Sequence, residues 1–368
     1  MSRNLSLFEY DRRATQWAAV LDQRDWTYLV LPIGRDDSWL SHVAGRPLHI
    51  EAHCGVVLVR RGLAPALLVE PEARWPEDTG WLTVERVADL ATTLRQFSDG
   101  RKAGIVGRFG SELALAAIQK SGVRTEDATQ DLLATRELKG DEELHACEHA
   151  AWIIDRCFER LLHRVKPGDT AAHIAAAVHA DALDIGASAC EVLMFRWVTS
   201  ASGARLAVDL PGDEVVHVGG TLLCSIRVAA ASGHSALMAR PVVFGMPNEP
   251  IERAARGAGS ALAAIVRHAR PGVAIGSLES IATVAAESEG ATLLSARIHG
   301  IGLDTCEAPT GAGALIQQGH ILVVECACSA DTMAASLQAC TLIVEHEAAR
   351  RLDSMALGLF APELHRPA

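Results

Sequence analysis

Two segments of this chain repeat each other without a gap, and this duplication most constrains the fold. Residues 161–187 read LLHRVKPGDTAAHIAAAVHADALDIGA, and residues 265–291, which start 104 positions later, read IVRHARPGVAIGSLESIATVAAESEGA. Each runs from a helix end through Pro-Gly into a second helix that stops at Gly-Ala before β-rich sequence. A chance likeness of two alanine-rich helices is the alternative, but it leaves the matched Pro-Gly and Gly-Ala unexplained. The repeat predicts two αβ halves about a pseudo-twofold axis, with a ligand groove between them.

The residues before the duplication predict a small α/β unit. Periodicity favours a helix over 12–22, a strand over 26–33, a hairpin over 55–70, and a short strand running into a helix over 102–120. The polar stretch from residue 134 is linker-like at first and then opens a long helix. On its exposed side we expect Glu142, Glu143 and Glu148. We therefore predict one domain at 1–136 and a second at 139–368, in an α/β (α+β) fold.

Composition narrows the partners that such a chain can take. The net charge is −11 and the pI about 5.7, which argues against nucleic acid and anionic membranes, because both favour a basic surface. No run of ~18 apolar residues is present, so we expect no membrane span. Nine scattered cysteines, an odd number, are typical of reduced thiols in a cytoplasm.

Several stretches of the chain are similar to one family. ATRELKGDEELHACEHAAW, RVKPGDT, RIHGIGLDTCEAP and QQGHILVVECA resemble, in this order, conserved segments of the creatinase/aminopeptidase P/prolidase family. The resemblance implies a small N-terminal creatinase-type domain and a C-terminal pita-bread domain with pseudo-twofold duplicated αβ halves. It also implies a homodimer.

The metal enzymes of that family hold two divalent ions with two Asp, one His and two Glu. Carried over by position, the resemblance places Ile226 and Leu237 at the two Asp positions and Ala339 (or Gln338) at the last Glu. His299 and Glu325 match the His and the first Glu. A lone His and Glu do not hold two ions, so we expect no catalytic metal and no other cofactor.

Creatinase is the family's precedent for catalysis without a metal. The segment GHSALMAR keeps its Gly-to-Arg spacing and puts Arg240 in the matching place. Other positions depart from creatinase, because Ala239 replaces a Glu, Cys306 replaces a His, and Asp209 or Leu210 stands where a proton-shuttling His is expected. Creatine is therefore not the expected substrate.

The remaining polar residues supply the candidate site. His299 and Glu325 are the expected acid–base pair, because a carboxylate in an apolar strand must be paired or serve chemistry. Arg240 is expected to grip a substrate carboxylate, with a salt bridge to Glu325 or Glu307 as the structural alternative. Four further residues are substrate-binding candidates: Glu307, which alternatively caps a turn; His234; Asp209; and Cys306, a nucleophile or else an apolar filler.

These residues lead to one main hypothesis and two alternatives. The main one is a metal-independent enzyme that acts on a small polar, amino-acid-like or amide substrate by C–N hydrolysis or elimination. The first alternative is a degenerate member that keeps the fold as a binding or scaffold module. The second is a metal-dependent Xaa-Pro aminopeptidase or dipeptidase.

Overall fold

The computed structural model describes residues 4–33, 38–106, 111–200, 203–332 and 334–362. Contacts divide the chain into two compact units, Met1–Glu142 with Ala231–Gly233, and Glu143–Ala230 with His234–Ala368. The domain limits 1–136 and 139–368 stay a prediction about folding units and lie a few residues before this division. Within the described residues, no helix is long and apolar enough to cross a membrane.

The first unit is a mixed sheet with helices around it. Its strand order is β4-β3-β2-β1-β5-β6. The strands are β1 (Tyr28–Pro32), β2 (Gly55–Arg60), β3 (Ala66–Val69), β4 (Thr83–Arg86), β5 (Ala103–Ile105) and β6 (Thr125–Asp127). The helices are α1 (Leu7–Arg24), α2 (Ser38–Ala44), α3 (Leu90–Ser98), α4 (Glu112–Ser121) and α5 (Thr129–Glu137). The side chains of β2 and β3 are buried on both faces, which makes this sheet the centre of the unit's core.

Most sequence expectations for this unit are confirmed. The helix predicted over 12–22 is the middle of α1, and the predicted hairpin is the antiparallel pair β2–β3. The stretch expected to begin as a linker at residue 134 instead continues α5 to Glu137. Residues 107–110, within the predicted strand-to-helix segment, lie outside the described residues.

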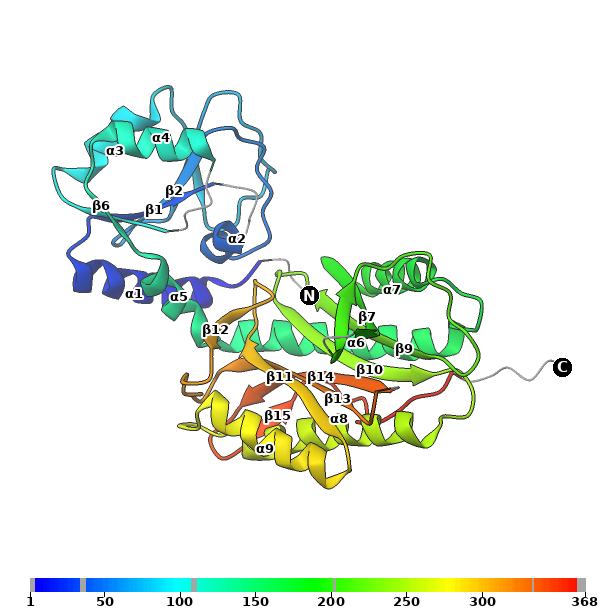
Figure 1. The fold of residues 1–368 in the computed structure, drawn as a ribbon. Coiled ribbons are helices and arrows are strands. Elements are labelled where there is room, and N and C mark those ends of the chain that lie inside the picture. Colours follow the sequence, from blue (N-terminus) through cyan, green and yellow to red (C-terminus); the bar gives the residue numbers. More distant parts are fainter. Residues whose placement is uncertain (1–3, 34–37, 107–110, 201–202, 333, 363–368) are drawn as a thin grey trace. The chain divides into compact units, whose positions relative to one another are not determined.

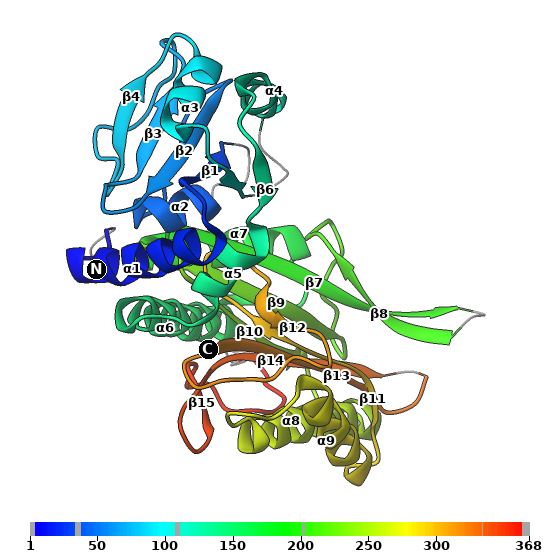
Figure 2. The ribbon, with the colours of Figure 1, turned by 90° about the vertical axis from the view of Figure 1, so that its left-hand side faces the viewer.

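The second unit is a curved sheet with helices on one face (Figures 1 and 2). Its strand order is β12-β11-β13-β14-β10-β9-β7-β8, and β15 pairs with β14. The strands are β7 (Ala189–Ser200), β8 (Gly203–Asp209), β9 (Thr221–Ala229), β10 (Ser235–Val243), β11 (Thr292–Gly300), β12 (Glu307–Thr310), β13 (Ile321–Ser329), β14 (Ala335–Val344) and β15 (Ala349–Arg351). The helices are α6 (Asp141–Arg164), α7 (Ala171–Ile185), α8 (Glu249–His268) and α9 (Ile275–Ser288).

Main-chain hydrogen bonds and strand positions of the two halves correspond, which confirms the duplication. Strands β9 and β13 start 100 residues apart, as do β10 and β14. The amide of Gly219 donates to Phe244, and the amide of Gly319 donates to Val344. Two isolated bridges after the Pro-Gly turns also match, Thr170–Val215 and Ala274–Leu315, with the 104-residue offset of the helical repeat on one side and the 100-residue offset of the strands on the other. The unit is therefore two copies of one αβ hydrogen-bonding pattern joined at the β10–β14 pair.

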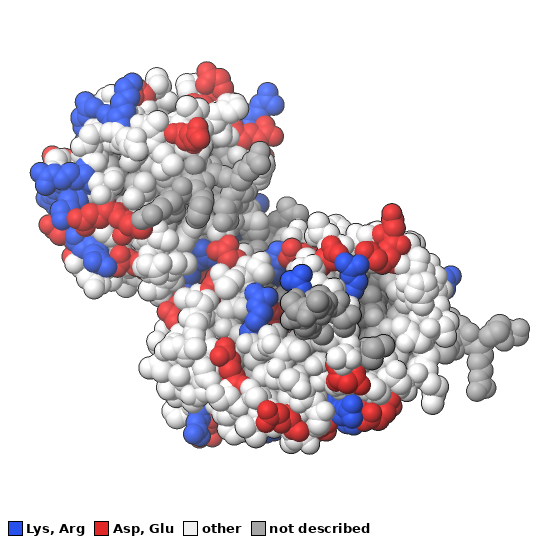
Figure 3. Space-filling model, viewed as in Figure 1, with Lys and Arg blue, Asp and Glu red and all other residues white. Residues whose placement is uncertain are grey.

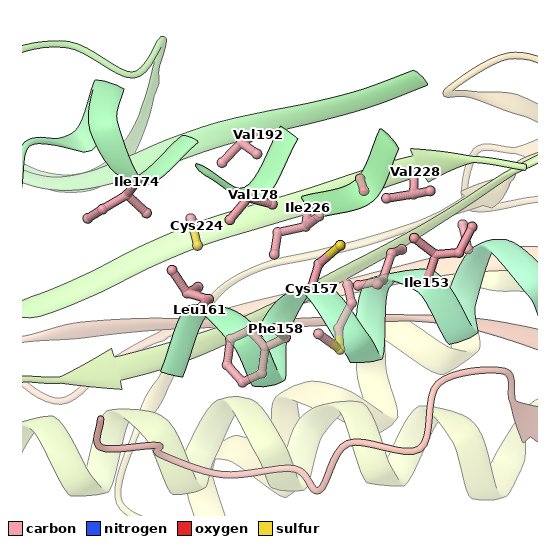
Figure 4. Packing of buried hydrophobic residues seen from close by; sticks show 14 of the residues in the cluster. Ile153, Cys157, Phe158, Leu161, Ile174, Val178, Val192, Cys224, Ile226 and Val228 are labelled. Carbon is pink, nitrogen blue, oxygen red and sulfur yellow. The ribbon is translucent and has the colours of Figure 1, made fainter. Parts of the chain in front are cut away.

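The helices cover one face of this sheet. Buried residues recur every three or four positions along α6, which gives the helix one apolar side. That side packs on β9, where Cys224, Ile226 and Val228 meet Ile153 and Cys157 (Figure 4). Each large apolar side chain buried there stabilises the fold by roughly 1.5–3 kcal/mol. Helices α8 and α9 cover the second half in the same way.

The opposite face of the sheet carries the candidate site; we call it the open face, although its apolar side chains are buried. Successive strand residues point to opposite faces, so Leu237 and Ala239 belong to this face while Met238 and Arg240 belong to the helix face. Its apolar cluster includes Val323, Ala327, Leu337, Ala339 and Ile301. A polar side chain here therefore stands on a largely apolar wall.

Candidate functional site

One row of directly paired residues crosses the middle of the open face. Neighbouring strands lie about 4.8 Å apart, so residues in register stand side by side. The register of the five strand pairs aligns Arg297, Glu325, Ala339, Ala239, Ser225 and Leu193. The row ends in the charged residues Arg297 and Glu325 in the second half of the unit and in the apolar Leu193 in the first half.

His299 and Glu325 come together at the charged end. They project from neighbouring strands to the same face, with Nε2 of His299 4.0 Å from Oε1 of Glu325. Their side chains are 9% and 10% exposed, so both reach solvent from a nearly buried position. The Nδ1 atom of His299 lies 2.9 Å from the carbonyl of Gly300. Because that carbonyl only accepts, Nδ1 carries a proton, and Nε2 is the ring nitrogen that faces Glu325.

Arg297 is a third member of this group. Its Nη1 lies 3.5 Å from Oε1 of Glu325, and its side chain is 64% exposed. Arg297 is not among the site residues predicted from the sequence. Strand alternation is the signal that finds it, because a residue two before His299 on one strand points to the same face.

The two halves differ in these three residues. The 100-residue correspondence of β9 and β13 matches Glu325 to Ser225. The registers with β7 and β11 then match His299 to Phe195 and Arg297 to Leu193. The second half thus supplies a polar wall, and the first half supplies an apolar one.

The expectation that Ile226 lies on the site wall is wrong. Ile226 is 1% exposed and packs under α6 and α7, opposite Met238 (Figure 4). The position match that gave Ile226 was anchored at Gly220, whereas the glycine that corresponds to Gly319 is Gly219, and this one-residue slip turns a strand residue to the other face. Ser225 therefore occupies the wall position.

The metal ions that the family resemblance implies do not fit these positions. Ser225, Leu237 and Ala339 stand where carboxylates would be needed, and the last two side chains carry no ligand atom. Across the residues that the structure describes, no group of three or more His, Cys, Asp and Glu side chains is arranged to hold an ion. His299 and Glu325 alone supply too few donors for a closed site.

Arg240 lies on the helix face, away from the open face, which corrects its expected role in gripping a substrate. It is 1% exposed, and its Nη2 lies 2.6 Å from Oδ1 of Asp353. The guanidinium also donates to the carbonyls of Ala239, Ala339, Met355 and Ala356. Its donors are therefore committed to the C-terminal segment and to the main chain of β10 and β14, and the partner of its buried salt bridge is Asp353 rather than Glu325 or Glu307. Burial raises the pKa of Asp353, although Arg240 and Arg351 oppose this shift.

His234 is buried beside α6. Its Nε2 lies 3.1 Å from Oε1 of Glu143, and both side chains are less than 5% exposed. Glu143 was expected on the exposed side of the long helix, and the structure corrects this, because the β9–β10 turn brings His234 over that position. A role for His234 in substrate binding stays a prediction.

Asp209 lies at the end of β8, half exposed and 3.4 Å from Arg196. It borders a cavity of about 250 Å³ whose lining includes Met194, Phe195 and Leu223. All of the lining residues belong to the first half, so the structure does not place Asp209 with His299 and Glu325.

Cys306 ends the turn after β11, and Glu307 is the first residue of β12. Oε1 of Glu307 accepts a hydrogen bond from the amide of Asp304 at 3.0 Å, which is the turn-capping alternative. Cys306 is exposed. Partial desolvation raises the pKa of its thiol, although Arg297 lowers that pKa in part. The thiol is therefore protonated at neutral pH, which does not favour its role as a nucleophile.

Comparisons with known proteins agree with this fold. The sequence profile described as metallopeptidase family M24 matches residues 145–348. An uncharacterized peptidase of Bacillus subtilis, YqhT, is 24% identical over 195 residues, which are 52% of this chain and 54% of that protein. The chain thus spans about half the length of this curated relative.

Solved structures share the fold along almost the whole chain. Dipeptidase PepE from Mycobacterium ulcerans superposes with a TM-score of 0.78 at 19% identity, covering 98% of this chain and 99% of that one. A prolidase from Pyrococcus furiosus superposes with a TM-score of 0.73 at 18% identity, covering 92% and 99%. At these identities the likeness establishes the architecture, which confirms the predicted pita-bread fold.

Proposed function

The chain belongs to metallopeptidase family M24, and from this premise we propose that it is a metal-independent enzyme that hydrolyses a C–N bond in a small amide or amino-acid-like substrate. The observation that carries the proposal is the approach of His299 and Glu325 on one wall. Two proton-transferring groups 4.0 Å apart, both partly open to solvent, are what acid–base catalysis needs.

The chemistry follows from the two side chains. The oxygen of a water molecule attacks the amide carbon while the Glu325 carboxylate takes a proton from that water. The C–N bond then breaks as His299, which in this step is protonated on both ring nitrogens, gives its Nε2 proton to the leaving nitrogen. The products are a carboxylic acid and an amine. The proton of Glu325 then returns to His299 through a bridging water, because the two groups lie 4.0 Å apart, and this restores the starting state.

Elimination is the variant of this chemistry in which Glu325 removes a proton from carbon instead of from water. The apolar residues beside Glu325, Ala339 and Val323, favour a substrate that displaces bulk solvent from the site. This exclusion of bulk solvent is compatible with both elimination and hydrolysis. The products distinguish the two reactions, because elimination leaves a double bond and consumes no water.

A non-catalytic binding protein is the second candidate. The observation in its favour is that Ser225, Leu237 and Ala339 have replaced reactive side chains with small or aliphatic ones on the same face. Such a protein needs a groove but has no need of the His299–Glu325 pair. We propose a homodimer and a cytoplasmic location for either candidate, and light scattering of the purified protein tests the first of these.

The experiment compares turnover by the wild type and by site variants after each has been treated with a chelator. Xaa-Pro dipeptides and N-acyl amino acids serve as the substrate panel, with amine release as the readout. Glu325→Gln and His299→Ala should each lower kcat about 10²–10⁴-fold with little change in thermal stability. Glu191→Gln is the matched control, because Glu191 also pairs with an arginine, Arg227, at 3.0 Å, outside the pair.

Three outcomes contradict the proposal. Full activity in both variants would remove the acid–base assignment. Turnover that appears only after Mn²⁺ or Zn²⁺ is added would favour the metal-dependent alternative. Substrate binding without any turnover of the panel would favour the binding protein.

A further inference from the structure

We infer that Arg297 recognises a carboxylate on the substrate, so that the site selects small anionic amides such as N-acyl amino acids and dipeptides. The inference rests on the proposed function of His299 and Glu325 and names the substrate class of that same site.

The donors of Arg297 are largely uncommitted. A guanidinium has five N–H donors in a planar fork that matches the two oxygens of a carboxylate. In the part of the chain that the structure describes, Arg297 makes one ion pair, at 3.5 Å, and its side chain is 64% exposed. A ligand at Glu325 would therefore meet a cation that still has hydrogen bonds to give.

Other arginines near this face are already engaged. Arg227, on β9, lies 3.0 Å from Glu191 and 3.4 Å from the hydroxyl of Ser235. Arg240 is buried on the other face against Asp353. On the surface that Figure 3 shows, acidic and basic side chains are interspersed with large uncharged areas. Arg297 thus stands out by its place beside the acid–base pair in a protein whose net charge is −11.

The ion pair with Glu325 couples recognition to reactivity. Without substrate, Arg297 faces Oε1 of Glu325, the same oxygen that lies closest to His299. A substrate carboxylate competes for the guanidinium and releases that oxygen to accept a proton from water. An uncharged amide offers no such competition and leaves Arg297 on the base. Anionic substrates are therefore favoured in binding and in activation of Glu325.

Cys306 supplies a reporter that does not depend on turnover. It is the exposed thiol of the turn after β11, and its pKa responds to the charge of Arg297. Iodoacetamide and iodoacetate alkylate a thiolate by the same displacement of iodide, but only iodoacetate is an anion. The ratio of their rates at Cys306, followed by peptide mass spectrometry, measures how strongly the neighbourhood attracts a carboxylate.

Arg196→Ala is the matched control for Arg297→Ala. Arg196 is also exposed, at 61%, and also pairs with a carboxylate, Asp209, at 3.4 Å. Both variants remove one positive charge, but Arg196 lies on β7, across the sheet from Glu325. Arg297→Lys keeps the charge and removes the fork.

The experiment combines the rate ratio with protection by two probes, N-acetylglycine and its uncharged amide, N-acetylglycinamide. The ratio of the iodoacetate rate to the iodoacetamide rate at Cys306 should be higher in the wild type than in Arg297→Ala. In the wild type, N-acetylglycine should slow alkylation at about tenfold lower concentration than N-acetylglycinamide does. Arg297→Ala should abolish this difference, Arg297→Lys should keep part of it, and Arg196→Ala should leave it unchanged.

Equal protection by the two probes in the wild type, or an unchanged rate ratio in Arg297→Ala, would overturn the inference. Glu325→Gln separates it from the proposed function. That variant should lose turnover yet bind N-acetylglycine at least as tightly, because Arg297 no longer faces an anion. Anion selectivity in a protein that never turns over the panel would refute the enzyme while keeping Arg297 as a recognition residue.

Discussion

The two halves of the second unit share a backbone but not a chemistry. Main-chain hydrogen bonds at Gly219 and Gly319 repeat each other, and β9 and β13 run over matched residues. On the open face, however, Glu325 of the second half stands where the first half has Ser225. On the helix face, Arg240 of the first half stands where the second half has Cys340. The strand pattern therefore fixes where each side chain lies in the sheet. The identity of that side chain decides whether the position is reactive, contributes to stability or has neither role.

The largest effect should come from testing which β9 residue faces the site. Ile226→Asp places an unpaired carboxylate among the apolar side chains under α6 and should destabilise the protein by on the order of 5 kcal/mol, enough to prevent folding. Ser225→Asp, one residue away on the open face, should fold. Circular dichroism and urea unfolding check both variants. The reverse ranking would show that Ile226 faces the open side.

Removing the buried cation of the first half should have the next largest effect. Arg240→Met leaves the buried Asp353 with Arg351, at 3.0 Å, as its remaining ion-pair partner, and should cost about 3–5 kcal/mol. Cys340→Ala, at the matched position, should cost only about 1 kcal/mol. A double variant, Arg240→Met with Asp353→Leu, should recover much of the loss in the urea midpoint. No recovery would mean that the carbonyl contacts of Arg240, rather than the ion pair, hold the C-terminal segment.

Rebuilding the lost ligands should give a smaller but specific effect. Ser225→Asp, Leu237→Asp and Ala339→Glu together would surround His299 and Glu325 with carboxylates. This protein should gain stability in Mn²⁺, by about 2.7 kcal/mol when the free ion is 100-fold above Kd. Ser225→Asn in the same background is the control. A folded triple variant whose melting temperature ignores Mn²⁺ would show that these positions do not converge.

The smallest effect concerns pH and the buried thiols. Burial raises the pKa of Cys340 to about 12 from 9.0, so the unfolded chain loses this proton first as the pH rises. Stability contributed by the thiol is therefore present below pH 9 and is lost between pH 9 and about 12. At pH 10 the loss is roughly 1.4 kcal/mol. Urea midpoints at pH 8 and pH 10 should fall less in Cys340→Ala than in the wild type, and equal falls would contradict the assignment.

The fold was predictable because its signals are periodic and duplicated. The repeated Pro-Gly and Gly-Ala punctuation gave both halves, and the HGIGL and VVE segments placed His299 and Glu325 on adjacent strands. The face to which a strand residue points is harder to predict. Matching from Gly220 instead of Gly219 assigned Ile226 to the site wall, although the residue lies in the core. Arg240 could not be placed from its motif, since its partner Asp353 lies 113 residues later in the chain. Arg297 was missed because the family resemblance assigns it no role, although it opens the quoted segment RIHGIGLDTCEAP two residues before His299.

The correspondence between the halves is made by main-chain donors and acceptors, which every residue except proline carries alike. A lineage with such a frame can therefore lose, gain or exchange a reactive group on either wall by single-codon changes, without having to rebuild its architecture. Glu325 and Ser225 are two such outcomes at equivalent positions of the two halves. The same scaffold should accept new specificities more readily than a fold whose strands depend on the side chains of the active site.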